Sequence, residues 1–249
     1  LGAAYLQKKD LKTSLLNFDK AFSLDSSLII SGIQKHFLKR TFCDWSDDEE
    51  LKLILRQTID TEENVSPWFC LSLEDNVKNH FIRAKKFTNK FNLLKLNNNI
   101  YSNSKIKIGY FSADFRTHAM GHLMVKMLEL HNKKEFKLYG FYFGPSIKKD
   151  DELSKRIISC FDEFIDIRFK NDLEVIEKTK EKGLDIAIDL MGFAGKQNRF
   201  GIFSYKCAPL QINFLGYPGT SGSKFMDYVV LDNKILCPEN DQFFSEKFI

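Results

Sequence analysis

The sequence predicts an α/β protein in which an N-terminal helical segment precedes a Rossmann-like, doubly wound parallel sheet. Three observations support this fold class. The apolar residues before residue 100 recur mostly at helical spacing. From Lys105 onward, short apolar runs rich in β-branched and aromatic residues alternate with amphipathic stretches, which is typical of strands and helices in a parallel sheet. The run Asn97-Asn98-Asn99 separates the two patterns, so a domain boundary is expected near residue 100.

The composition is that of a folded, globular chain. Its 249 residues, of which 43% are hydrophobic and 28% charged, suffice for a substantial core. The 37 basic and 33 acidic residues are spread along the chain, which disfavours nucleic acid as a partner. Because no apolar run reaches the roughly 18 residues of a spanning helix, no membrane partner is expected. Five widely separated cysteines without a C-x-x-C pair indicate reduced thiols and a cytoplasmic location.

Residues 1–27 predict a partial tetratricopeptide repeat. Small and aromatic residues follow the order of such a repeat: Gly2, Tyr5, Ser14, Phe18, Ala21 and Ser26. An ordinary amphipathic helical hairpin is the alternative. A lone repeat needs neighbours to bury its faces, and these are expected upstream. The lack of an initiator Met and the apolar end at Ile249 lead to the expectation that both termini are cut from a longer protein.

Residues 28–100 predict a helical linker region. The acidic run Asp47–Glu50 suits the N-terminus of a helix because carboxylates there favourably meet the helix dipole. Pro67 is expected to end any helix that reaches it. A further helix is expected from Leu73 to Leu94. Residues 101–249 then form the sheet domain.

The sheet domain is expected to alternate strands and helices. Strands are expected at residues 105–112, 137–143, 163–166, 185–190, 212–215 and 227–231. Helices are expected at residues 122–132, 151–161 and 172–182. In doubly wound sheets, ligands bind at the carboxyl ends of the strands. The polar loops that follow the strands are therefore the candidate sites.

The first such loop, Ser112 to Met124, carries Asp114, His118 and His122. Two histidines four residues apart suggest a metal pair if both lie on one helix face. No third ligand stands at convincing spacing, so no metal is expected, and a metal-dependent hydrolase is kept as an alternative. His118, in the loop, is the better candidate for hydrogen bonding or proton transfer, whereas His122 precedes an apolar helix and is more typical of a structural histidine.

Two further loops follow later strands. Asp189 ends a strand and is followed by Gly192, Gly195 and two cations, which suits a polar or anionic ligand, although a charged surface turn explains it nearly as well. The run Leu215 to Gly222 contains three glycines and a proline, which let the backbone approach a ligand closely. It is not a Walker loop, because Lys224 lacks the G-K-[ST] context.

Several motifs together carry a family resemblance. They are Cys43-Asp44-Trp45, Ser66-Pro67-Trp68, Gly109 to Phe115 with His118 and His122, Asp189 with Gly192, and Leu215 to Gly222 followed by Phe225-Met226-Asp227-Tyr228. Over essentially the whole chain, the sequence resembles the O-linked N-acetylglucosamine transferase family, the glycosyltransferase family 41 type, including its SPINDLY members. The run L-G-Y-P-G-T-S-G followed by F-M-D-Y is the most specific of these motifs.

The resemblance implies a GT-B architecture of two Rossmann-like lobes, preceded by a tetratricopeptide superhelix that presents protein substrates. The chain would cover the last repeat, the linker helices and the N-terminal lobe, while a C-terminal lobe after Ile249 would hold the donor's uridine diphosphate. The implied reaction moves N-acetylglucosamine from UDP-N-acetylglucosamine to Ser or Thr hydroxyls of proteins, with inversion and without a metal or other cofactor. The fragment alone is expected to be inactive.

The resemblance also implies roles for residues of the three loops. His118 and Asp189 are the expected catalytic residues. The expected substrate-binding residues are Asp114, His122, Gly192, Leu215, Gly216, Tyr217, Pro218, Gly219 and Thr220. His118 is expected to act as the base or to hydrogen-bond the sugar or phosphate, while a water chain or a donor phosphate oxygen is the alternative proton acceptor.

Two alternative functions remain open at this point. One is a noncatalytic protein-binding module made of a repeat and a Rossmann-like lobe. The other is a relative that uses another nucleotide sugar, such as a glucose or fucose nucleotide. Ala119, Met191 and Lys206-Cys207 depart from the residues common in the family, so they bear on which sugar is used.

Overall fold

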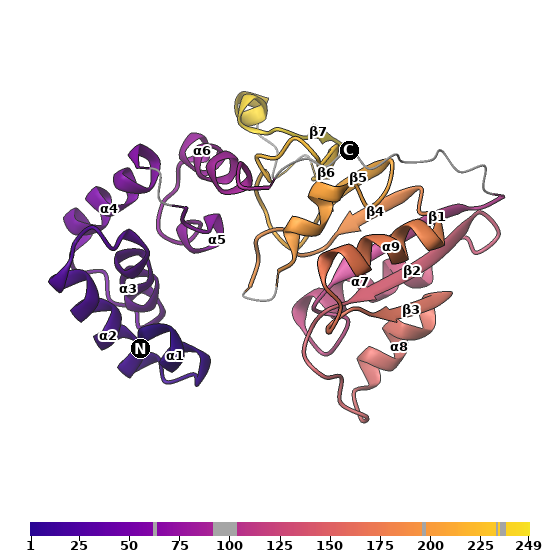
Figure 1. Ribbon diagram of the computed structural model, residues 1–249, viewed down its shortest axis with the longest axis horizontal. Coiled ribbons are helices and arrows are strands. Elements are labelled where there is room, and N and C mark those ends of the chain that lie inside the picture. Colours follow the sequence, from indigo (N-terminus) through magenta and orange to yellow (C-terminus); the bar gives the residue numbers. More distant parts are fainter. Residues whose placement is uncertain (62–63, 92–103, 196–197, 233, 235–237) are drawn as a thin grey trace. The chain divides into compact units, whose positions relative to one another are not determined.

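The computed structural model describes residues 1–61, 64–91, 104–195, 198–232, 234 and 238–249. These residues form two compact units, Leu1–Lys90 and Phe91–Ile249, which are described separately below. Figure 1 shows the helices of the first unit and the sheet of the second. The boundary expected near residue 100, with its run Asn97-Asn98-Asn99, lies outside the described residues.

The first unit is built from helices. They are α1 (Gly2–Gln7), α2 (Leu11–Leu24), α3 (Ile29–Thr41), α4 (Asp48–Asp60), α5 (Pro67–Cys70) and α6 (Val77–Thr88). A Cβ atom on Gly2 would lie 2.9 Å from the Phe18 ring, and the Ser14 hydroxyl donates to the Gly2 carbonyl oxygen at 2.8 Å. Small residues thus let α1 and α2 pack closely. That this hairpin is a tetratricopeptide repeat stays a prediction.

Local sequence explains where the later helices of this unit begin. Acidic residues do occupy the first turn of α4, as expected. No described helix runs into Pro67 from the N-terminal side, in keeping with the expectation; Pro67 instead begins α5, where its missing N–H costs no helical hydrogen bond. Helix α6 begins later than the expected Leu73, because the Asn76 side chain caps it by accepting from the Asn79 N–H at 3.0 Å.

A buried arginine joins α4 to α6. The Arg83 side chain is 1% exposed and pairs with the Glu74 carboxylate. It also donates to the Thr58 hydroxyl at 2.6 Å and to the Leu55 carbonyl oxygen at 3.1 Å. A buried cation that lacked these partners would cost several kcal/mol, so the pairing fixes how these helices pack. The apolar core beside it comprises Phe22, Ile29, Ile33, Leu51, Ile54, Leu55, Val65 and Cys70.

The second unit contains a parallel sheet. Among the described residues its strands are β1 (Ile106–Ser112), β2 (Phe136–Tyr142), β3 (Glu163–Asp166), β4 (Ile186–Asp189), β5 (Leu210–Phe214), β6 (Tyr228–Val230) and β7 (Lys247–Phe248). Their order is β3-β2-β1-β4-β5-β6-β7, and every neighbouring pair is parallel. From β1 to β3 each new strand is added toward one edge of the sheet, and from β4 to β7 toward the other edge. This change of direction between β1 and β4 confirms the doubly wound fold class. Strand β7 was not expected.

Side chains of β1 alternate between the two faces of the sheet. Ile108 and Tyr110 belong to a core with residues of α7 (Ala119–Glu129) and α8 (Glu152–Cys160). On the other face, Phe111 stacks on Phe141 at 4.4 Å and meets Phe203 of the short 3-10 helix η1 (Phe200–Tyr205) edge-on at 5.2 Å. Helix α9 (Asp172–Lys182) packs beside η1. The sheet is therefore buried on both faces, as apolar parallel strands require.

The helices of the second unit show clear end signals. Asn171 and Glu174 form a capping box at the start of α9, and Gly183 ends the helix in the left-handed conformation. The expected start of the first helix of this unit at His122 is wrong, since α7 begins three residues earlier with His118 as its cap. The second 3-10 helix, η2 (Pro238–Phe243), precedes β7.

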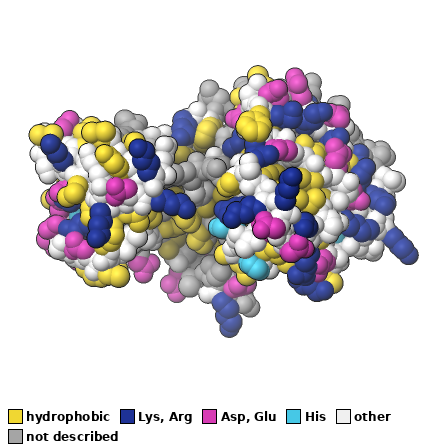
Figure 2. All heavy atoms as spheres, turned by 90° about the horizontal axis from the view of Figure 1, so that it is seen from below, with side chains coloured by type: hydrophobic (Ala, Val, Ile, Leu, Met, Phe, Trp, Pro, Cys, Tyr) yellow, Lys and Arg dark blue, Asp and Glu magenta, His cyan; other side chains and the backbone are white. Residues whose placement is uncertain are grey.

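Charges of both signs are mixed on the surface. Figure 2 shows one face of the molecule, on which Lys and Arg side chains lie interspersed with Asp and Glu side chains. Within the described parts of the chain, no helix combines the length and the apolar character needed to cross a membrane.

Candidate functional site

The loop after β1 is organised around the carboxylate of Asp114. The Asp114 N–H donates to the Ser112 hydroxyl oxygen at 2.9 Å, which turns the chain directly after the strand. Asp114 is buried, and its Oδ1 accepts from Arg116 Nη2 at 3.0 Å. Its Oδ2 lies 3.4 Å from Nδ1 of His118. The loop thus places one carboxylate between a guanidinium group and an imidazole.

His118 is both the cap of α7 and a partly exposed polar group. Its backbone is extended, and its Nδ1 accepts from the Met120 N–H at 3.3 Å. The side chain is 39% exposed. Because the Met120 N–H is fixed by the helix, Nδ1 is held as an acceptor, and the neutral ring then carries its proton on Nε2. In this tautomer Nε2 can donate a hydrogen bond to a ligand.

Asp189 ends β4, the neighbour of β1 at the reversal point. It is 1% exposed and lies opposite Phe111 in the strand register. Its Oδ1 accepts from the Met191 N–H at 2.9 Å and its Oδ2 from the Gly192 N–H at 3.0 Å. Both carboxylate oxygens are therefore occupied by the backbone of the following turn, which holds that turn in place.

Burial raises the pKa of Asp189 to about 6, although the Met191 and Gly192 N–H groups lower it in part. Because the pKa of Asp189 is higher in the folded state than in the unfolded state, folding favours the protonated carboxyl. The stability that this provides is present below the unfolded-state pKa of about 4 and is lost as the pH rises through the folded-state pKa of about 6. The difference from the ordinary value corresponds to about 3 kcal/mol.

An Asp189→Asn variant should lack this pH dependence. The neutral amide loses one backbone hydrogen bond at every pH but has no charge to bury. Between pH 4 and pH 7, the free energy of unfolding of the parent should therefore fall by about 2 kcal/mol relative to that of the variant. Urea unfolding across this range measures both, with the exposed Asp150→Asn as the matched control. Parallel profiles for the parent and Asp189→Asn would contradict the assignment.

The glycine-rich loop after β5 interlocks with the turn after Asp189. A Cβ atom on Gly216 would lie 1.9 Å from the Leu190 carbonyl oxygen, so only glycine fits this approach. A Cβ atom on Gly192, which has a φ of +53°, would lie 2.6 Å from the Tyr217 Cβ atom. Leu215 itself has a φ of +69°, a strained value for a branched side chain. Such strain is common at functional sites.

A buried glutamate fixes the far end of the glycine-rich loop. The Glu246 carboxylate accepts from the Thr220 hydroxyl at 2.7 Å and from the Ser221 N–H at 2.7 Å. The Ser245 hydroxyl donates to the same carboxylate at 3.0 Å. Sequence reasoning missed Glu246, because a single Glu near a chain end carries no local signal. The contact joins residues 25 positions apart in the sequence, and Glu246 directly precedes β7.

A buried amide lies beside Asp189 and was also missed. Asn213 of β5 is opposite Asp189 in register and is 0% exposed. Within the described ranges, neither its Nδ2 nor its Oδ1 has a hydrogen-bond partner. An unsatisfied buried amide is costly, so such groups concentrate where function requires them. The sequence signal was a pair of polar residues, Gln211 and Asn213, that alternate with apolar residues in the strand.

The structure brings together most of the predicted site residues, in two connected groups. Asp114 and His118 form the first group, and Asp189, Gly192, Gly216 and Tyr217 form the second. The Ser112 hydroxyl, 3.8 Å from the Met191 sulfur, links the loop after β1 to the turn after β4. Thr220 lies in the buried contact with Glu246, whereas Leu215 and Pro218 are exposed on the same loop and Gly219 packs on the Tyr217 ring.

His122 is not part of either group. It lies in the first turn of α7 with an exposed side chain that makes no hydrogen bond or ion pair to the described site residues. In the part of the chain that the structure describes, no three His, Cys, Asp or Glu residues lie close enough to hold a metal ion.

Comparison with known proteins places this site in a family. Residues 81–249, which contain all three loops, match glycosyl transferase family 41. The chain belongs to this family.

Individual relatives match more than half of the chain. The chain is 30% identical over 145 residues to a probable UDP-N-acetylglucosamine–peptide N-acetylglucosaminyltransferase, SEC, of Arabidopsis thaliana, covering 58% of the chain and 14% of that protein. It is 30% identical over 134 residues to such a transferase of Caenorhabditis elegans, covering 53% and 11%. A probable SPINDLY transferase of Petunia hybrida is 26% identical over 159 residues, covering 61% and 17%. The chain thus spans less than a fifth of these relatives.

A solved structure shares the fold. A mutant O-GlcNAc transferase of Thermobaculum terrenum superposes with a TM-score of 0.79 at 20% sequence identity. The match covers 100% of this chain and 49% of that one. The predicted combination of a helical segment and a parallel-sheet lobe is therefore confirmed.

Proposed function

We propose that the complete protein transfers N-acetylglucosamine from UDP-N-acetylglucosamine to Ser or Thr hydroxyls of proteins. The observation that carries the proposal is the family match across residues 81–249, which includes all three polar loops at the carboxyl edge of the sheet. The relatives named above carry this activity in their names. The donor is a nucleotide sugar, the helical unit contributes to binding the protein acceptor, and the enzyme works in the cytoplasm.

In the proposed reaction, the acceptor hydroxyl attacks the anomeric carbon from the face opposite the leaving diphosphate. The bond from the anomeric carbon to the acceptor oxygen forms while the bond to the phosphate oxygen breaks, and the hydroxyl proton leaves to a base. The reaction inverts the anomeric centre and needs no metal or other cofactor. The chain's own contribution is to position the sugar and the acceptor and to stabilise the developing charge.

His118 acts in this scheme as a hydrogen-bond donor to the sugar or the leaving phosphate. The contact from the Met120 N–H to Nδ1 supports this role, because it leaves the proton of the neutral ring on Nε2. A role as the base would require the proton to move to Nδ1, which faces Asp114 at 3.4 Å. A donor phosphate oxygen is then the simplest acceptor for the hydroxyl proton.

Asp189 acts by holding the turn after β4 rather than by touching the substrate. Both of its oxygens accept backbone N–H groups, and it is 1% exposed. The backbone of this turn packs against Gly216 and Tyr217. The glycine-rich loop can then present its backbone and the exposed Pro218 to the ligand.

A transfer assay with three donors tests the proposal. The complete protein is incubated with mixed cell proteins and with UDP-N-acetylglucosamine, UDP-glucose or GDP-fucose. We expect transfer from UDP-N-acetylglucosamine alone. Transfer only from another donor would assign a different sugar, and transfer from none would favour a noncatalytic binding module. The 249-residue chain by itself is expected to transfer nothing from any of them.

A further inference from the structure

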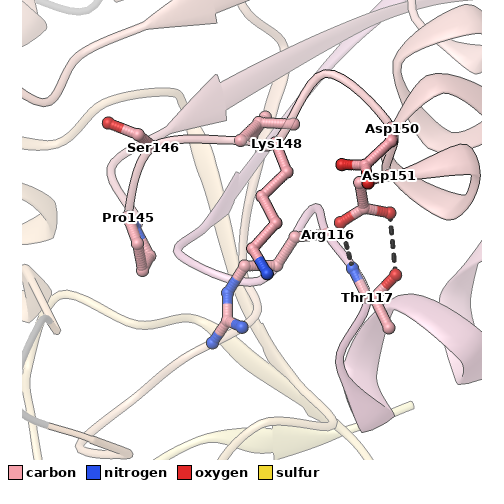
Figure 3. Close-up of a pocket in the computed structure, with 8 residues that line it drawn as sticks. Arg116, Thr117, Pro145, Ser146, Lys148, Asp150 and Asp151 are labelled. Atoms are coloured by element: carbon pink, nitrogen blue, oxygen red, sulfur yellow. Dashed lines mark hydrogen bonds between the residues drawn. The ribbon is translucent and has the colours of Figure 1, made fainter.

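A cavity separate from the interlocked glycine-rich loop opens between the loops after β1 and β2. Its volume is about 430 Å³. Its lining residues are Arg116, Thr117, Pro145, Ser146, Ile147, Lys148, Asp150 and Asp151. Figure 3 shows Arg116 and Lys148 extending toward the same part of the cavity, with Asp150 and Asp151 on the other side. No role in the proposed transfer has been assigned to it above.

The walls of this cavity are held by contacts within the protein. A Cβ atom on Gly144 would lie 1.9 Å from the Ala113 carbonyl oxygen, so the two loops are packed backbone to backbone. The Thr117 N–H and hydroxyl donate to the Asp151 carboxylate at 2.9 and 2.7 Å. Arg168 donates to the Ser146 hydroxyl at 2.9 Å. A site that is already formed loses little entropy when a ligand binds.

The two cations in the cavity retain donors for a ligand. Arg116 uses Nη2 on Asp114 at 3.0 Å, and its Nη1 has no hydrogen-bond partner among the described residues. Lys148 is exposed and forms no ion pair with any described residue. Because like charges repel, two cations that converge on one space favour an anion between them.

The acidic residues of the cavity differ in their availability. Asp151 caps α8 by accepting from the Ser154 N–H at 2.9 Å, in addition to its two contacts from Thr117. Its carboxylate is therefore fully engaged. Asp150 is exposed and has no ion pair in the described ranges, and the neutral partners of Asp151 leave its charge in place, so both carboxylates oppose anion binding.

We propose that this cavity binds an oxyanion, a phosphate or a carboxylate, carried by a peptide segment. Arg116 and Lys148 supply charge-assisted hydrogen bonds, and the hydroxyl of Ser146 lies in the same wall. Pro145 and Ile147 add an apolar surface for the adjoining peptide chain. The inference does not depend on which sugar, if any, the complete protein transfers.

Peptide binding to the complete protein tests this inference. The probes are a fluorescent peptide with one phosphoserine, the same peptide with Glu or Ser at that position, and inorganic phosphate as competitor. Binding should be tightest for phosphoserine and weakest for Ser. Lys148→Gln and Arg116→Gln should each weaken phosphopeptide binding roughly tenfold. Lys149→Gln, the adjacent exposed lysine outside the cavity, is the matched control and should change it less than about twofold.

A second variant is expected to change phosphopeptide binding in the opposite direction. Asp150→Asn removes one of the two opposing charges and should tighten phosphopeptide binding. If inorganic phosphate bound as tightly as the phosphopeptide, the cavity would bind a free anion and not one carried by a peptide, which would overturn the proposal. Equal binding of the phosphoserine and Ser peptides, or equal weakening by Lys148→Gln and Lys149→Gln, would overturn the proposal. Thermal unfolding of each variant identifies any that fail to fold, and Lys148→Gln, at an exposed position, should fold normally.

Discussion

Replacing His118 with alanine in the complete protein is expected to lower the rate of sugar transfer at least about 100-fold. The variant loses the Nε2 group that we assign as a donor to the sugar or phosphate. It also loses the cap of α7, where Nδ1 accepts from the Met120 N–H at 3.3 Å. Loss of the cap alone should cost about 1 kcal/mol of stability. Initial rates with UDP-N-acetylglucosamine and urea unfolding measure the two effects.

A His118→Asn variant separates the two roles. Asn is among the best helix caps, so its side-chain oxygen should take over the contact to the Met120 N–H and preserve stability. It cannot reach as far as Nε2 of the imidazole, so transfer should stay as low as in His118→Ala. If His118→Asn regained the parent's rate, His118 would be a structural cap and the assigned chemistry would be wrong.

A Gly216→Ala variant is expected to lose at least about 3 kcal/mol of stability. Its Cβ atom would lie 1.9 Å from the Leu190 carbonyl oxygen and 3.0 Å from the Met191 Cα atom. Both atoms belong to the backbone of the turn that Asp189 holds, so neither can rotate away as a flexible side chain would. The loop or the turn must shift, and transfer should fall together with stability. Urea unfolding and the transfer rate give the two readouts.

Gly195→Ala is the matched control for this substitution. Gly195 has a φ of +69°, but a Cβ atom there would lie 3.9 Å from its nearest neighbour, the Met191 Cε atom. Only the backbone strain remains, which costs about 1 kcal/mol. Similar losses at the two positions would mean that the loop and the turn do not interlock as described.

The sheet could be predicted from sequence because each strand and helix carries local signals. Asn171, Glu174 and Gly183 mark both ends of α9, and its predicted range of 172–182 matches the structure. Strand β3 likewise matches its predicted range of 163–166. The alternation of apolar runs with amphipathic helices then leads to a doubly wound sheet, because parallel strands require helical crossovers.

Other features depend on contacts between distant residues and were missed for that reason. Strand β7 consists of Lys247–Phe248 and exists only because it pairs with β6. The carboxylate of Glu246 accepts from Thr220, which lies 26 residues away in the sequence. That the buried amide of Asn213 lacks a hydrogen-bond partner among the described residues can be known only once its neighbours are placed. The start of α6 was missed for a different reason: the cap at Asn76 is a local signal, but the expected helix followed the apolar residues that precede it, from Leu73.

Residue type and strand ends predicted which residues of the candidate site lie close together, whereas their roles stay predictions. Asp114 and His118 do come together, as do Asp189 and the glycine-rich loop. The chemical roles depend on atoms that sequence does not position. The engaged oxygens of Asp189 and the engaged Nδ1 of His118 determine what each group can offer a ligand.

We propose that this chain is part of a protein O-GlcNAc transferase whose site includes His118. The most direct test incubates the complete protein with UDP-N-acetylglucosamine and mixed cell proteins, and maps attached sugars by mass spectrometry. We predict N-acetylglucosamine on Ser and Thr side chains with the parent and almost none with His118→Asn. Sugar attached equally by both proteins, or by neither while each is folded, would contradict the account.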